Sequence, residues 1–261
     1  MAVRPLIIAN WKMNPSTRRA ARDLAFRVGR SVRRVRGVDV AIAPPFPFLE
    51  AVRNAARNVL LAGQDVFSRP AGPFTGAVSP LMLRDLGVSY CIVGHSERRR
   101  HFGETDESVR EKVKALLAAG ITPVIAIGEE GTEANAVVPK AIATELHGAL
   151  AGISRRLLRS VVVAYEPVWA ISTNPGARPD TPDNATRRAI YIRKLLAKMA
   201  GGRIADGVRV IYGGSTNAKN AASFIAHDIR GMDGVLVGGA SLRADEFSAL
   251  VKAVAARRRR I

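Results

Sequence analysis

A glutamate stands at the end of an apolar run, where a strand would aim its side chain at a substrate. Glu166 follows the run 161–165, and Pro167 and Trp169 come shortly after it. Proline cannot extend a strand and tryptophan is too large to leave in water, so this segment indicates an aimed general base with a lid attached. A glutamate that simply faces water is the alternative, because isolated charged residues are mostly solvated.

A histidine follows another apolar run. His95 lies in the segment 93–99, which turns through glycine into a predicted helix start. The positive end of a helix disfavours the imidazolium ion and holds the ring neutral, so His95 could donate a proton to a carbonyl oxygen beside a carboxylate base. A satisfied structural histidine is the usual alternative. That interpretation is kept for His101, His147 and His227, which have no such neighbours in the sequence.

A lysine and two glycine pairs complete the set of candidate residues. Lys12 lies just past a strand, where it would supply a fixed positive charge, and Asn10 could orient it or the substrate. The pairs in 213–215 and 238–241 each follow a strand and precede a helix-like segment, so their N–H groups could bind one phosphate. The alternatives are a surface lysine and glycines needed only for tight turns.

These residues need a scaffold that brings them together. Short apolar runs bounded by turn residues predict eight strands, and segments with helical spacing separate them. Such alternation without a composition break favours a single domain over 1–261: a (β/α)8 barrel with eight parallel strands and an outer ring of helices. An open doubly wound sheet is the alternative. The predicted strands are residues 6–9, 38–43, 59–62, 90–93, 122–127, 161–165, 208–212 and 234–237.

The polar candidates fall at one end of these strands. In a parallel barrel the carboxyl ends of all strands share one face, so residues far apart in the chain would converge there. A base, a neutral acid, a lysine and a phosphate grip predict proton transfer next to a carbonyl group in a small phosphorylated substrate. This chemistry is aldose–ketose isomerisation through an enediolate. The residues that follow strands are Asn10, Lys12, Gln64, Asp65, His95, Glu129, Glu166, 213–215 and 238–239.

The composition is strongly basic. Forty Lys and Arg against 22 Asp and Glu give a net charge of +18, which favours anionic ligands. Much of the excess is arginine in helix-like segments and in a basic C-terminal tail, 255–261, for which the sequence leaves both order and disorder open. Without aromatic interleaving, zinc spacing or an RNA-binding signature, the sequence predicts no specific nucleic-acid partner.

The sequence also bears on location. Cys91 lies alone inside an apolar run, so we expect a small buried hydrophobe and no internal disulfide. No run approaches the ~18 apolar residues of a membrane span, and the N-terminal run is too short for a secretory signal. A cytoplasmic protein without a membrane partner is the simplest expectation.

Five motifs carry a resemblance to a known family. In this order along the chain, they resemble those of the triosephosphate isomerases. The resemblance implies interconversion of dihydroxyacetone phosphate and D-glyceraldehyde 3-phosphate, in glycolysis and gluconeogenesis, with no cofactor and no metal. The motifs are 10–14 (NWKMN), 94–99 (GHSERR), 164–171 (AYEPVWAI), 212–215 (YGGS) and 236–242 (LVGGASL).

The resemblance also implies roles for individual residues, in a family well known for pairing a carboxylate base with a neutral histidine. Glu166 would move the proton between C1 and C2, with His95 as the electrophile. Lys12 and Asn10 would stabilise the oxyanion, and Glu97 would support Lys12 and the acid. The implied phosphate-binding residues are Ser172, Ser215, Gly238 and Gly239, and the implied hinge of a closing lid is Pro167, Val168 and Trp169.

The segment 64–79 resembles the loop through which members of the family form homodimers. Its length and the aromatics Phe67 and Phe74, which we expect to be exposed, favour burial against a partner. We expect contacts at Thr75 and Gly76, with Thr75 approaching the partner's catalytic lysine region.

The lid departs from the family pattern, and two alternatives remain open. Segment 172–180 stands where the family usually has Gly-Thr-Gly-Lys, and it is longer and contains prolines that would stiffen the second hinge. The longer lid leaves open an isomerase for a four-carbon ketose phosphate. The arginine-rich surface leaves open a barrel that only binds RNA or another polyanion. The residue before Ile127 is alanine where the family often has cysteine, a change without an expected functional effect.

Overall fold

The strands close into a complete barrel. A computed structural model describes residues 4–130, 139–171, 174–225 and 231–258. Each strand pairs in parallel with the next, and the last pairs with the first through Leu6–Gly234 to Ala9–Val237, which excludes the open sheet. The strands are β1 (Leu6–Asn10), β2 (Asp39–Ala43), β3 (Leu60–Gly63), β4 (Val88–Val93), β5 (Thr122–Ile127), β6 (Val162–Tyr165), β7 (Arg209–Tyr212) and β8 (Gly234–Val237).

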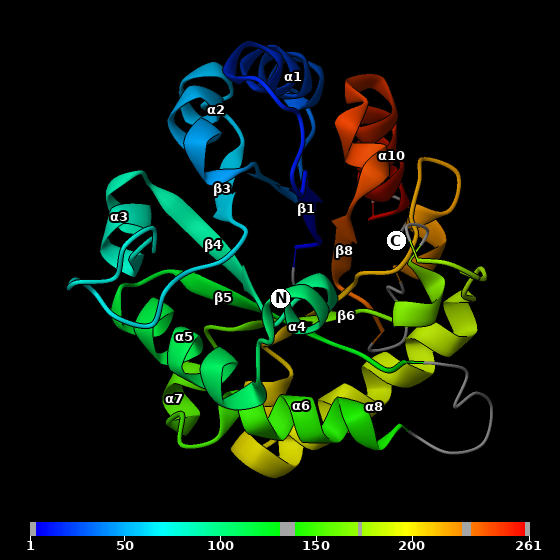
Figure 1. Ribbon diagram of the computed structural model, residues 1–261. Coiled ribbons are helices and arrows are strands. Elements are labelled where there is room, and N and C mark those ends of the chain that lie inside the picture. Colours follow the sequence, from blue (N-terminus) through cyan, green and yellow to red (C-terminus); the bar gives the residue numbers. More distant parts are fainter. Residues whose placement is uncertain (1–3, 131–138, 172–173, 226–230, 259–261) are drawn as a thin grey trace.

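Helices surround the strands, as Figure 1 shows. The α-helices are α1 (Arg18–Val32), α2 (Leu49–Ala55), α3 (Pro80–Asp85), α4 (Ser96–Phe102), α5 (Asp106–Ala118), α6 (Lys140–Leu150), α7 (Arg155–Leu158), α8 (Pro182–Ala200), α9 (Gly202–Ala205) and α10 (Ala244–Arg258). Short 3₁₀ helices are η1 (Phe46–Phe48), η2 (Val168–Ala170), η3 (Ala221–Phe224) and η4 (Gly239–Leu242).

Local sequence signals start several helices. The Thr17 side chain accepts a hydrogen bond from the Ala20 N–H at the start of α1. Thr181 caps α8 in the same way through Asn184, and Pro182 occupies the first turn. α10 continues to Arg258, so residues 255–258 are helical and do not belong to a separate tail, because Val254 and Ala255 keep its inner face buried.

Side chains alternate across the barrel wall. In β1, Leu6 and Ile8 belong to a cluster inside the barrel, whereas Ile7 and Ala9 belong to the larger cluster between strands and helices. This two-residue period makes both faces of each strand apolar, as a buried parallel sheet requires. The apolar filling fixes the strands, and therefore the positions of the side chains that follow them.

A polar group closes the amino-terminal end of the barrel. Arg209 donates to the Asp39 carboxylate over 2.8 Å and to the Tyr90 hydroxyl over 2.7 Å. All three side chains come from strands, and these hydrogen bonds pair polar groups at the edge of an apolar core. The opposite, carboxyl end carries the candidate functional residues.

Candidate active site

Glu166 follows β6 directly and is 2% exposed. Its N–H donates to the Ile127 carbonyl over 2.8 Å, which continues the β5–β6 ladder by one residue. Glycines directly after both neighbouring strands, β5 and β7, make room for it. A Cβ atom at Gly213 would lie 2.7 Å from Glu166 Cγ, and one at Gly128 would lie 1.8 Å from the Glu166 carbonyl oxygen. The close approach of three chain segments thus requires glycine at both places.

The Glu166 carboxylate has two neighbours. Oε1 lies 3.3 Å from His95 Nε2, and Oε2 accepts a hydrogen bond from the Ser96 N–H over 3.3 Å. The base and the histidine, although 71 positions apart in the sequence, therefore face each other at the mouth of the barrel, as the strand-end argument predicts.

The contacts of His95 indicate which ring nitrogen accepts a hydrogen bond. His95 caps α4, and its Nδ1 accepts a hydrogen bond from the Glu97 N–H over 3.2 Å. Acceptance requires a lone pair on Nδ1, so the ring proton belongs on Nε2. That proton points toward Glu166 and the pocket, where it can be donated.

Lys12 is held by both its backbone and its side chain. Its φ of 52° lies in the left-handed region that a non-glycine residue rarely adopts. The Lys12 N–H donates to the Asn10 side chain over 3.0 Å, and Gln64 donates to the Lys12 carbonyl over 2.7 Å. The ammonium group lies 2.5 Å from Glu97 Oε1. These contacts hold the ammonium group of Lys12 in place, and they offset the free-energy cost of its left-handed backbone conformation.

The Glu97 carboxylate is partly buried beside Lys12. Burial raises the pKa of Glu97, but the hydrogen bond and charge of Lys12 outweigh burial, and the pKa is lowered overall. Glu97 is therefore favoured in its ionised form, as a counter-ion beside Lys12.

A single pocket collects the predicted residues. Beside the base, the histidine and the lysine, the pocket reaches the turns after β7 and β8, where a Cβ atom at Gly239 would meet no atom within 4 Å. The predicted residues that line this pocket are Asn10, Lys12, His95, Glu166, Ser215, Gly238 and Gly239. Ser172 lies outside the described residues.

Ser215 contacts the lid segment. Its N–H and its hydroxyl both donate to the Ala170 carbonyl, over 3.3 Å and 2.7 Å. Ala170 ends η2, which contains Val168 and Trp169 of the predicted hinge. The turn expected to hold phosphate is thus also a contact for the lid.

Glu129, to which the sequence prediction gave no role, connects the hinge to the barrel. Its Oε1 accepts hydrogen bonds from the Tyr165 hydroxyl over 2.8 Å and from Trp169 Nε1 over 3.4 Å, and Val168 N–H donates to its carbonyl over 3.2 Å. Burial raises the pKa of Glu129. The only sequence signal was its position after a strand, beside the aromatic residues of the base motif.

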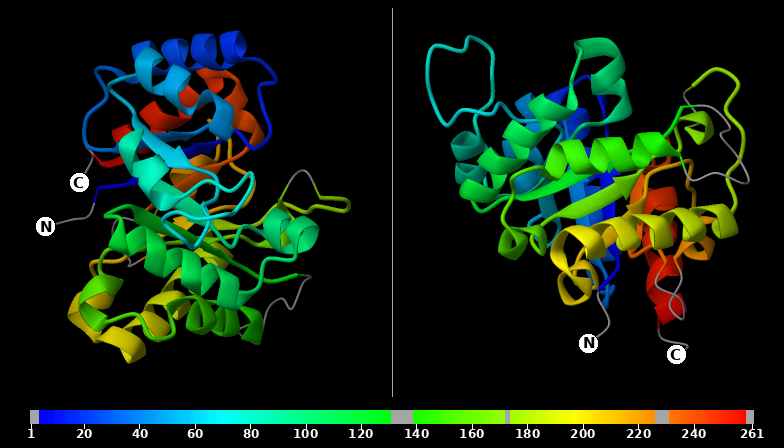
Figure 2. Two further views of the ribbon diagram at one scale, coloured as in Figure 1. Left: turned by 60° about the vertical axis from the view of Figure 1, so that its left-hand side comes forward. Right: turned by 90° about the horizontal axis from the view of Figure 1, so that it is seen from below.

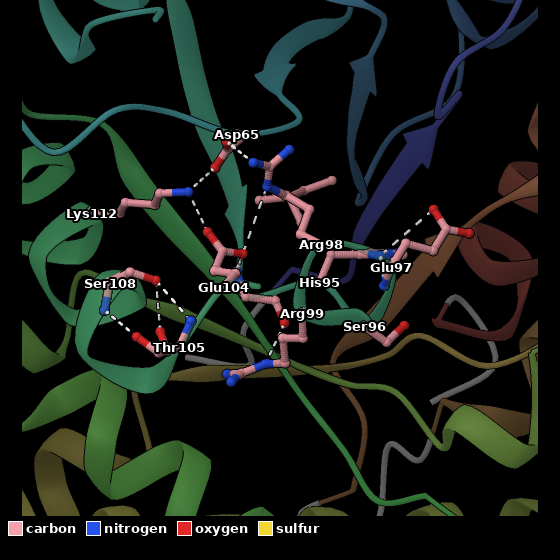
Figure 3. A network of polar contacts seen from close by, with 12 residues as sticks. Asp65, His95, Ser96, Glu97, Arg98, Arg99, Glu104, Thr105, Ser108 and Lys112 are labelled. Carbon is pink, nitrogen blue, oxygen red and sulfur yellow. Dashed lines mark hydrogen bonds and ion pairs between the residues drawn. The ribbon is translucent and has the colours of Figure 1, made fainter. Parts of the chain in front are cut away.

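A second missed group lies behind His95 (Figure 3). Glu104 is 8% exposed and accepts a hydrogen bond from the Gly94 N–H over 3.0 Å. Lys112 pairs with Glu104 and, over 2.7 Å, with Asp65, which also pairs with Arg98 over 2.7 Å. We name Asp65, Arg98, Glu104 and Lys112 the charge cluster. It joins the start of segment 64–79 to α4 and α5.

The segment 64–79 projects from the barrel (Figure 2). Thr75 and Gly76 lie at its exposed tip, and Phe74 is 41% exposed. The expectation that Phe67 is also exposed is wrong. Its ring is half-buried and packs on Phe74 with the ring centroids 4.5 Å apart, so one aromatic shields the other.

Other expectations concern groups outside this pocket. Cys91 is fully buried, and burial raises the pKa of its thiol. His101 and His147 are exposed, whereas His227 lies outside the described residues.

Within the described ranges, no helix is long and apolar enough to cross a membrane, and no group of His, Cys, Asp and Glu side chains could hold a metal ion.

A closed parallel barrel with a carboxylate, a histidine and a lysine at its carboxyl end defines the class of (β/α)8-barrel enzymes. A family model described as triosephosphate isomerase matches residues 5–254. A triosephosphate isomerase of Carboxydothermus hydrogenoformans is 43% identical over 252 residues, covering 95% of this chain and 98% of the relative. One of Paracidovorax citrulli is 43% identical over 263 residues, covering 98% and 100%. The chain belongs to the triosephosphate isomerase family.

Proposed function

We propose that Glu166, His95 and Lys12 together interconvert dihydroxyacetone phosphate and D-glyceraldehyde 3-phosphate, the reaction of this family in glycolysis and gluconeogenesis. One observation carries the assignment of roles. The carboxylate of Glu166 and the neutral Nε2–H of His95 lie 3.3 Å apart on the wall of the pocket that Lys12 also lines. A base and an acid side by side can act on two adjacent carbon–oxygen centres of one substrate.

The reaction moves two protons, one from C1 to C2 and one from the C1 hydroxyl to the C2 oxygen, with no net gain or loss of electrons. Glu166 removes the proton from C1 of dihydroxyacetone phosphate, while Nε2–H of His95 hydrogen-bonds to the carbonyl oxygen on C2. The enediolate charge is stabilised by Lys12, which Glu97 and Asn10 hold in place. Return of the carbon proton to C2 by Glu166, with transfer of the O1 hydroxyl proton to O2 through His95, gives the aldehyde. Because the aldose and the ketose are isomers, this chemistry requires no external oxidant or reductant.

The phosphate group of the substrate fits the opposite part of the pocket. Gly238 caps η4 and Gly239 begins it, and both offer backbone N–H groups there, together with Ser215. The role that the resemblance implies for Ser172 falls outside the described residues. Because Ser215 donates to the Ala170 carbonyl, its N–H must leave that carbonyl to bind phosphate. Phosphate binding and movement of the lid about Pro167, Val168 and Trp169 are therefore coupled in this proposal.

Replacement of the base tests the assignment. Glu166→Gln keeps the size of the side chain but removes the proton acceptor, and we expect kcat to fall by about 10²–10⁴-fold with little change in KM. The assay follows steady-state isomerisation of glyceraldehyde 3-phosphate. Glu130→Gln, a change of an exposed carboxylate near the site, is the control and should retain full activity. An active Glu166→Gln enzyme would refute the role of Glu166.

The same assay can measure whether the enzyme prefers a three-carbon or a four-carbon sugar phosphate. We propose triose phosphates as the substrates because relatives of matching length bear that name. Parallel assays with a four-carbon ketose phosphate measure the preference directly. A larger kcat/KM for the longer sugar would assign the chain to the alternative substrate.

We also propose a cytoplasmic homodimer formed through segment 64–79. Support comes from large apolar side chains that remain exposed on this segment, on α3 and α4 after it and beyond β1, since such gatherings mark interfaces. A cytoplasmic location suits a glycolytic step and a thiol that has no disulfide partner. The exposed side chains are Met13, Phe74, Leu81, Met82 and Phe102.

Disruption of the loop tip tests the dimer. Thr75→Arg would place a long charged side chain in the proposed interface, so we expect sedimentation to show a monomer and kcat to fall. Ser154→Arg, at an exposed site before α7, is the control and should leave the dimer intact. Monomeric wild-type protein with full activity would refute the proposal.

A further inference from the structure

A basic hollow lies between the last turns of α1 and α10, which pack side by side (Figure 1). Its volume is about 690 Å³. Four cations line it, three from the end of α1 and the residues after it and one from α10, above a lining of Val35, Ala255 and Ala256. We name these four residues of the hollow, Arg30, Arg33, Arg34 and Lys252, the groove cations.

The hollow lies on the face opposite the active site. The chain runs from the end of α1 directly to the amino end of β2 at Asp39, whereas the catalytic residues follow the carboxyl ends of the strands. The groove cations are all exposed. They therefore cannot serve the substrate pocket, and the isomerase reaction leaves their charge unexplained.

The groove cations are not neutralised by the protein. Among the described residues, no carboxylate lies within ion-pair distance of any of them, whereas Asp23, the acidic residue of α1, pairs with Arg19 and Arg22 near the other end of the helix. Two helix C-termini at the hollow supply roughly −1 elementary charge in total. Four positive charges exceed that, so a net attraction for anions remains.

The side chains that line the hollow indicate which kind of anion it binds. Three of the four cations are arginines, whose planar donors match phosphate oxygens bidentately. No aromatic side chain lines the described part of the hollow, so it offers no platform on which unpaired bases would stack. No large apolar side chain there could enter a lipid layer. We propose that this hollow binds the phosphate backbone of duplex nucleic acid without reading its sequence.

The proposal has a quantitative consequence. If all four groove cations contact phosphates, log K should fall with log salt with a slope of about −3.6, since each contact contributes about −0.9. A fourfold rise in salt, from about 50 to 200 mM, then weakens binding by about a hundredfold. The isomerase reaction should be unchanged at saturating duplex, because the two sites lie on opposite faces.

Two variants with the same net charge test whether the hollow itself binds. The first replaces the groove cations by alanine. The control replaces four exposed arginines of α7, α9 and the residue after α7, on the other side of the barrel, namely Arg155, Arg156, Arg159 and Arg203. Fluorescence anisotropy with a labelled mixed-sequence DNA duplex measures binding, and isomerase activity shows that both variants are folded.

We expect the variant without the groove cations to lose at least tenfold in affinity for the duplex, together with most of the salt dependence of binding. The control variant should bind the duplex nearly as tightly as the wild type does. Equal losses in the two variants would overturn the proposal, because bulk charge alone would then account for binding. Groove-dependent binding of phosphatidylserine vesicles or of inorganic polyphosphate, without binding of the duplex, would also overturn it.

Discussion

At the scale of single residues, glycines decide where the catalytic carboxylate lies. Gly213 is half-buried beside Glu166, and a Cβ atom there would lie 2.7 Å from Glu166 Cγ. Real Cβ contacts are not that short, so Gly213→Ala must displace the carboxylate from His95. Misplacement of a catalytic group by about 1 Å can cost 10²-fold in rate, so we expect kcat to fall by up to about that factor.

The control for this prediction is Gly202→Ala at the start of α9, where an added Cβ meets no atom within 4 Å. Steady-state kinetics and thermal unfolding of both variants separate misplacement from misfolding. A Gly213→Ala enzyme with wild-type kcat would show that the base tolerates the shift.

Glu145 on α6 gives the stability of the protein a pH dependence. It accepts a hydrogen bond from the Gly128 N–H over 2.8 Å, and burial raises its pKa to about 7 despite the nearby charge of Arg99. A carboxyl group with a raised pKa binds its proton more tightly in the folded state. Its contribution therefore stabilises the fold at acidic pH and is lost as the pH rises from about 4.5 through about 7.

The full shift corresponds to about 3 kcal/mol of unfolding free energy. Urea unfolding of the wild type and of Glu145→Gln at pH 5 and pH 8, at one protein concentration, measures it. We expect the variant to gain stability relative to the wild type as the pH rises. Parallel pH profiles for the two proteins would contradict the shifted pKa.

At the scale of elements, the charge cluster ties the catalytic helix to the projecting segment. Lys112 from α5 contacts Asp65 at the base of segment 64–79 and Glu104 behind His95, with its side chain only 12% exposed. Lys112→Met leaves two buried carboxylates without this cation, and removal of one partner from a buried pair costs about 3–5 kcal/mol.

Lys114→Met on the same helix is the control. Lys114 pairs with Glu111 over 2.8 Å, but its side chain is 44% exposed, and surface pairs contribute about 0–1 kcal/mol. Urea unfolding of both variants compares the two sites. Similar losses for Lys112→Met and Lys114→Met would show that burial does not strengthen the cluster.

The sequence predicts these elements better than it predicts their long-range contacts. The spans 122–127 and 234–237 match β5 and β8, because apolar runs bounded by turns define both ends. β4 starts two residues before the predicted Tyr90, since Val88 pairs with Leu61 of β3, a partner that local pattern does not reveal.

In the candidate site too, the sequence predicts residues at strand ends better than it predicts long-range contacts. The strand-end residues Lys12, His95 and Glu166 could be found because parallel strands deliver their carboxyl ends to one face. Glu104 and Lys112 could not, since each resembles a solvated charge on a helical segment until the fold buries it. Glu129 was visible by position, but its contacts with Tyr165 and Trp169 depend on how the lid returns to the barrel.

At the scale of the whole molecule, the two ends of the barrel differ. The proposed catalytic residues lie at the carboxyl ends of the strands, and Arg209, Asp39 and Tyr90 close the amino-terminal end. The described chain enters at that closed end just before β1 and leaves it at the end of α10 (Figure 2). An affinity tag or a fused reporter on either terminus therefore extends away from the mouth of the barrel, and the enzyme can be tethered to a surface by either end with its entrance open to solution.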